Sequence, residues 1–74
     1  MEAIHRSITR LSSHEITLLS RIADGRTNAQ LGVELHRSEK TIRNQLTGLY
    51  AKLGASNRAA AVAIYLRLEK LEQF

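Results

Sequence analysis

The chain has 74 residues and no cysteine, so it is long enough for one small domain and cannot use disulfides or thiolate metal sites. It contains no apolar run long enough for a transmembrane helix and no signal-peptide core at its start, so we expect a cytoplasmic protein. The net charge is +4, and the excess lies between residues 37 and 58, where five basic residues accompany one acidic residue, a pattern that favours a polyanionic partner.

The composition favours helices. Proline is absent, glycine occurs four times, and no β-branched and aromatic residues alternate over the length of a strand. Residues 1–10 show no clear period and are expected to form an arm or linker. Residues 11–74 are expected to form one all-α domain.

A first helix is predicted to begin after Ser12 and to end before Gly25, a residue type favoured just past a helix. Ser12 and Glu15 have the spacing of a capping box, in which each side chain binds the backbone N–H of the other residue. Leu11 and Ile16 have the spacing of a hydrophobic staple. The expected core positions of this helix are Leu18, Leu19 and Ile22.

A short second helix is predicted after Thr27. Thr27 and Gln30 form another capping box, and Leu31 and Leu35 lie four residues apart on one face. This helix is expected to end near Leu35 or His36.

A third helix, over about residues 39–53, is predicted to have two unlike faces. Ser38 is a favourable N-cap, and Gly54 is a favourable terminator. An apolar stripe at steps of four, three and four residues is expected to face the core: Ile42, Leu46, Leu49 and Leu53. The opposing face is basic and able to form hydrogen bonds: Lys40, Arg43, Asn44 and Thr47.

A fourth helix is predicted to open at Ser56 or Asn57 and to run to about Gln73. Its apolar side chains lie on two sides, which is more apolar surface than one small core needs. The larger set comprises Ala61, Ile64, Tyr65, Leu68 and Leu71, and the smaller set comprises Val62 and Leu66.

Two short helices joined by a tight turn and followed by an amphipathic basic helix have the layout of a helix-turn-helix. An α-helix fits the major groove of B-DNA, where residues near its start reach base edges. Arginine pairs with guanine there and asparagine with adenine, which suits Arg43 and Asn44. The sequence therefore predicts an all-α, four-helix bundle that contains a helix-turn-helix.

A gapless series of motif residues between about residues 11 and 66 resembles the LuxR/GerE family, also known as the NarL/FixJ output domain. The residues that carry this resemblance are Leu11, Glu15, Gly25, Thr27, Asn28, Leu35, Ser38, Thr41, Ile42, Lys52, Leu53, Gly54, Asn57, Arg58 and Ala61.

The resemblance implies a role for three sets of residues. Base contacts are implied for Arg43, Asn44 and Thr47. Phosphate contacts are implied for Ser38, Lys40, Thr41, Lys52, Asn57 and Arg58. Arg37 replaces the family's usual apolar residue and is expected to face phosphate as well. The last helix commonly forms the dimer contact in this family, and we expect that contact to use Val62, Ile64, Tyr65 and Leu68.

Three further positions depart from the family pattern. Gly32 stands where the family has alanine, and it could either permit a close approach of the recognition helix or weaken the unit. Gln45 stands where histidine is frequent, and Gly48 lies inside the recognition helix.

The chain offers no constellation for catalysis or for a cofactor. His5, His14 and His36 have no ligand spacing, no nucleophile has an evident base, and the glycines form no phosphate-binding loop. We therefore expect a protein that is not an enzyme and needs no cofactor or metal.

We expect sequence-specific binding of double-stranded DNA by a transcriptional regulator, either free-standing or the output domain of a response regulator. It would bind as a homodimer, with RNA polymerase as a further partner. Two alternatives stay open: a domain like region 4 of a sigma factor, and a protein-interaction module or anti-activator on the same fold. The Lys52–Gly54 motif and the Asn57–Arg58 pair favour the LuxR/GerE type over the sigma factor.

Overall fold

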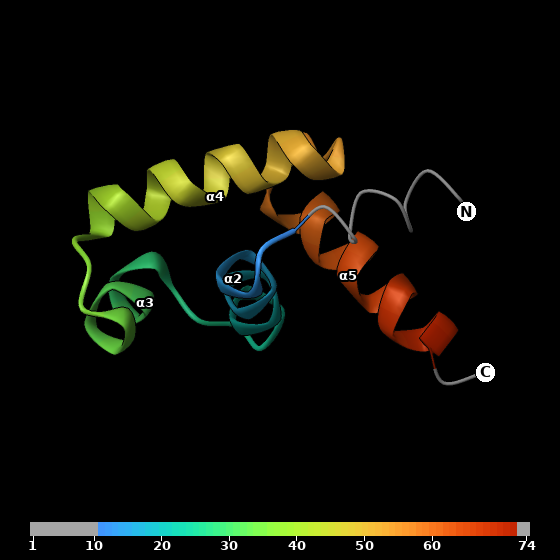
Figure 1. Cartoon of the computed structure of the whole chain (residues 1–74), viewed down its shortest axis with the longest axis horizontal. Helices are drawn as coiled ribbons and strands as arrows, with labels where there is room; N and C mark the ends of the chain where they lie inside the picture. The colour runs from blue at the N-terminus through green and yellow to red at the C-terminus, as the bar shows by residue number, and fades with distance from the viewer. Residues whose placement is uncertain (1–10, 73–74) are drawn as a thin grey trace.

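A computed structural model describes residues 11–72, which form four helices and no strand (Figure 1). The helices are α2 (Ser13–Ala23), α3 (Asn28–Leu35), α4 (Glu39–Leu53) and α5 (Arg58–Glu72). The all-α class and the four expected helices are thus confirmed. The expected arm over residues 1–10 and the expected helix end at Gln73 lie outside the described residues. Of these four helices, none is both long and apolar enough to cross a membrane.

Side-chain caps begin α2 and α3 as the sequence predicts. The Glu15 N–H donates to Ser12 Oγ at 3.1 Å, and the Ser12 N–H donates to Glu15 Oε1 at 2.9 Å. Thr27 and Gln30 form the same reciprocal pair, also at 3.1 and 2.9 Å. Each box satisfies N–H groups that have no partner within the helix, so both boundaries are encoded locally.

The turn between α3 and α4 is short because His36 adopts a left-handed conformation, with φ 57° and ψ 46°. This conformation is uncommon for a residue with a side chain. The chain then reverses through Arg37 and enters α4, whose N-cap is Ser38. At the other end of α4, Gly54 is left-handed at φ 71°, as expected for a terminating glycine.

Gly32 packs directly against this turn. A Cβ atom at Gly32 would lie 2.6 Å from the backbone oxygen of Arg37, closer than real Cβ contacts come. The Arg37 N–H also donates to the Gly32 carbonyl oxygen at 2.8 Å. Of the two interpretations of Gly32, close approach is therefore the correct one, and the approaching backbone is the turn that leads into α4.

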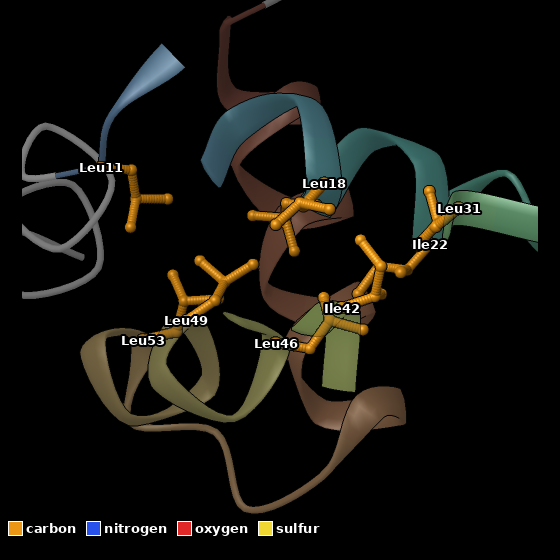
Figure 2. Close-up of a cluster of buried hydrophobic side chains, with 10 residues drawn as sticks. Leu11, Leu18, Ile22, Leu31, Ile42, Leu46, Leu49 and Leu53 are labelled. Atoms are coloured by element: carbon orange, nitrogen blue, oxygen red, sulfur yellow. The ribbon is translucent and has the colours of Figure 1, made fainter. Parts of the chain in front are cut away.

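The apolar stripes of the helices meet in one core. The α3 helix packs on α4, α2 packs on α5, and α4 packs on α5. Figure 2 shows buried side chains from several helices meeting between the ribbons. The cluster of buried residues comprises Leu11, Leu18, Leu19, Ile22, Leu31, Ile42, Leu46, Leu49, Leu53 and Ala61. Leu11 belongs to it, whereas Ile16 lies outside it and is 43% exposed, so the staple spacing identified only one buried residue.

Candidate nucleic-acid interface

One long face of α4 is left uncovered by the other helices that the structure describes. The helix runs along one side of the molecule, with the other helices placed on the opposite side of its axis (Figure 1). Its core stripe is buried, and at 100° per residue the opposing positions must point outward. The exposed residues on this side are Lys40, Arg43, Asn44, Thr47, Gly48 and Ala51.

The three expected base-contacting residues share this outer face. The side chains of Arg43 and Asn44 form no hydrogen bond or ion pair with any residue between 11 and 72. Thr47 Oγ1 donates to the Arg43 carbonyl oxygen at 3.0 Å. Its proton is therefore used within the helix, which leaves a lone pair and a methyl group for a partner.

The start of α4 brings four expected phosphate-contacting residues together. Arg37 and Lys40 are exposed, and within the described part of the chain their side chains have no polar partner. Ser38 Oγ accepts the Thr41 N–H at 3.0 Å and donates to Thr41 Oγ1 at 2.9 Å. The Ser38 hydroxyl thus serves as the N-cap, whereas the Thr41 hydroxyl keeps its own proton to donate.

Lys52 lies on the flank of α4 that faces the start of α2. Its Nζ is 2.9 Å from Glu15 Oε1. The Ser12 N–H, and then the Lys52 ammonium, stabilise the charged carboxylate and lower the pKa of Glu15 below its usual value. The capping carboxylate therefore also sets the position of this expected phosphate contact.

A second contact between α2 and α4 joins His14 to Gln45. His14 Nε2 and Gln45 Oε1 are 3.0 Å apart. From the sequence, Gln45 was only a departure from the family pattern, and no role was expected for His14. Thirty-one residues separate the two, so no local pattern indicates that they meet.

Two polar side chains at the start of α5 form hydrogen bonds within the protein. Arg58 donates through Nη1 to Asn28 Oδ1 at 2.8 Å and through Nη2 to the carbonyl oxygen of Arg26. Asn57 Oδ1 accepts the Ala60 N–H at 2.8 Å as the cap of α5. Two expected phosphate contacts are therefore already part of the fold, and Arg58 joins α5 to the α2–α3 connection.

An ion-pair network between α2 and α3 was not anticipated. Glu34 lies 3.4 Å from Arg21 Nη1 and 2.8 Å from Arg26 Nε. It pairs with two basic residues that lie outside the strongly basic segment. The spacing of these residues along the chain has no helical period, so the sequence held no signal for the network.

The exposed apolar side of α5 differs from the expected one. Leu68 is only 4% exposed, because it lies two turns after the buried Ala61 on the same side of the helix. Of the four expected dimer residues, Leu68 is thus buried within the single chain. Val62, Ile64 and Tyr65 are half-buried against the core, whereas Leu66, which the expected set omitted, is 50% exposed. The outward apolar stripe comprises Ala59, Val62, Ala63 and Leu66.

Comparison with known proteins identifies the family. Residues 9–65 match the model of the bacterial regulatory proteins of the luxR family, GerE. The chain is 34% identical over 62 residues to the spore germination protein GerE of Bacillus subtilis, an alignment that covers 84% of each chain. It is 38% identical over 68 residues to the probable transcriptional regulatory protein SgaR of Hyphomicrobium methylovorum, covering 92% of this chain.

Several relatives are much longer than this chain, which spans 32% of SgaR and 29% of the transcriptional regulatory protein YdfI of Bacillus subtilis. YdfI is 37% identical over 62 residues. No solved structure matched the chain. The family match over most of the described helices confirms the resemblance drawn from the motif residues. The chain belongs to the luxR family of bacterial regulatory proteins, a helix-turn-helix family of DNA-binding transcription regulators.

Proposed function

We propose that this chain binds double-stranded DNA in a sequence-specific manner, with α4 in the major groove. The outer face of α4 is the observation that supports this proposal. It presents Lys40, Arg43 and Asn44 without polar partners among the described residues, directly opposite a buried stripe that anchors the helix. A helix fixed on one side and rich in donors on the other is suited to reading base edges.

The polar side chains around α4 divide by role. Arg43 and Asn44 donate to base edges, and the methyl group of Thr47 contacts an apolar edge such as that of thymine. Phosphates are bound by the cationic or hydroxyl groups that stay accessible: Arg37, Lys40, Thr41 and Lys52. Lys52 exchanges its contact with Glu15 for one with phosphate. Ser38, Asn57 and Arg58 maintain the backbone geometry on which those contacts depend.

Fluorescence anisotropy with labelled duplexes tests this proposal. The binding site is first selected from a random pool, and affinity is then measured at two salt concentrations. Lys40→Ala should weaken binding to all duplexes and reduce the salt slope by about 1. Arg43→Ala should cost about 1–3 kcal/mol on the selected site and relax preference at one base pair.

Arg67→Ala is the matched control, because it removes the same charge from an exposed position on α5. It should leave affinity nearly unchanged. Equal losses of affinity in the Arg67 and Lys40 variants would mean that binding depends on net charge and not on the outer face of α4. Absence of binding at low salt would instead favour a protein-interaction module on the same fold.

We further propose that two copies bind together through α5. The stripe Ala59, Val62, Ala63 and Leu66 supports this, because its short side chains allow close approach and Leu66 is half exposed. Two copies related by a two-fold axis would place their α4 helices in successive major grooves, roughly 34 Å apart. A free-standing regulator and an output domain both accommodate this arrangement. In either form, binding beside a promoter would bring the protein next to RNA polymerase in the cytoplasm.

A further inference from the structure

Three of the four glycines of this chain have a clear role in its own fold, and Gly48 does not. Gly25 and Gly54 have positive φ angles, and Gly32 lies against the backbone of the α3–α4 turn. At Gly48, by contrast, an added Cβ atom would meet nothing within 4 Å, and φ is not positive. Neither backbone geometry nor internal packing requires glycine at this position.

Glycine is also unfavourable where Gly48 stands. The residue lies in the interior of α4, which runs from Glu39 to Leu53. Apart from proline, glycine is the residue that destabilises a helix interior most, since its backbone loses the most conformational freedom on folding. We expect the fold to gain stability from alanine here, and no contact among the described residues accounts for glycine.

Gly48 occupies the boundary between two sets of side chains on the outer face of α4. Asn44, an expected base contact, lies one turn before it, and Lys52, an expected phosphate contact, lies one turn after it. Thr41, another expected phosphate contact, lies two turns before it on the same side. Gly48 is exposed and lies between these expected base and phosphate contacts.

We propose that the sugar–phosphate strand of bound DNA lies directly against the α4 backbone at Gly48. The missing side chain lets the helix lie closer to the groove wall than any other residue would allow. Gly48 is thus a positioning residue that brings Asn44 and Lys52 within reach of their partners. This inference rests on the proposed function, because it presupposes that α4 enters the groove.

Substitutions that introduce side chains of increasing size at position 48 test the proposal. Gly48→Ala and Gly48→Leu should raise or preserve the midpoint of thermal unfolding, since both residues favour helix. Duplex affinity should nevertheless fall, and for leucine by at least about tenfold, which corresponds to about 1.4 kcal/mol. A purely structural role would move stability and affinity in the same direction.

The pattern across duplexes separates a strand contact from a base contact. The Gly48 variants should lose affinity on random duplex as well as on the selected site, whereas Asn44→Ala should lose affinity mainly on the selected site. Unchanged affinity in both Gly48 variants would overturn the inference, as would a loss limited to the selected site. If the unsubstituted chain binds no duplex, the proposed function itself fails, and this is evident before any variant is compared.

Discussion

The Arg58 guanidinium is held by oxygens of Asn28 and Arg26, and this changes how a basic residue near a DNA-binding face should be understood. Arginine can join several acceptors through its planar fork, so it links segments that lie far apart in the chain. Lys40, by contrast, has an exposed ammonium group with no polar partner among the described residues. Both carry one positive charge, but we expect Arg58 to affect the stability of the fold and Lys40 to affect DNA binding.

Arg58→Ala should lower the free energy of unfolding by about 1–3 kcal/mol, because it removes charge-assisted hydrogen bonds and leaves acceptors unpaired. Arg58→Lys should restore little of this loss, since one ammonium cannot reproduce the two-pronged geometry. Urea denaturation followed by circular dichroism measures both effects. Lys40→Ala should unfold like the unsubstituted chain while binding DNA more weakly. If Arg58→Ala unfolds like Lys40→Ala, the contacts with Asn28 and Arg26 do not stabilise the domain.

At the scale of the elements, α3, the following turn and α4 form one closely packed unit. The turn depends on the left-handed His36 and on the close approach of the Arg37 carbonyl to Gly32. This contact sets how α4 leaves the turn, and hence the direction in which its outer face points. Glycine at position 32 is a poorer helix former than the family's alanine, but it lets the turn pack closely against α3.

Gly32→Ala should destabilise the domain by about 1–3 kcal/mol, although alanine is the better helix former. The new methyl group would meet a backbone oxygen, which cannot rotate away as a flexible side chain could. Differential scanning calorimetry provides the measurement. Val33→Ala is the control, because Val33 is the next residue of α3 and is 79% exposed, so its unfolding temperature should change little. A Gly32→Ala variant as stable as this control would mean that the turn adjusts at no cost.

At the scale of the whole molecule, two helices leave unlike surfaces exposed. The outer face of α4 is basic and polar, whereas the outward side of α5 is a stripe of small and apolar side chains. A domain this small buries only part of its unfolded surface, so it gains from covering a remaining apolar stripe. Because α4 packs on α5, the proposed dimer contact and the proposed DNA contact lie on two helices that touch each other.

Leu66→Glu should abolish the gain in affinity that a duplex with two half-sites has over a duplex with one. Affinity for a single half-site should not change. The introduced carboxylates would meet across the two-fold axis, and each would lose its hydration. Titration of duplexes with one and two half-sites measures this difference. Ile16→Glu makes a similar change at a comparably exposed residue of α2 and should retain this gain in affinity. Loss of the gain in both variants, or in neither, would refute a dimer contact through the α5 stripe.

Residues close together in the chain determined the helix boundaries. Ser12, Thr27 and Ser38 cap their helices through N–H groups only three residues away, so tertiary contacts were not needed to predict them. The apolar stripe of α4 was equally evident, because one helical period separates its core side from its outer side. The outer face that we assign to DNA follows from that same period.

Only the tertiary structure decided which of two apolar sides of α5 is exposed and which polar groups are already engaged. Periodicity on α5 indicated two apolar sides, and only the folded structure shows that Leu68 is buried and Leu66 is exposed. The hydrogen bonds of Arg58 and the fit of Gly32 against the turn likewise join groups that have no fixed spacing along the chain. The sequence by itself therefore determined the helices, the family and the polar face of α4. Tertiary contacts decided the remaining surfaces, because they depend on how separate helices meet.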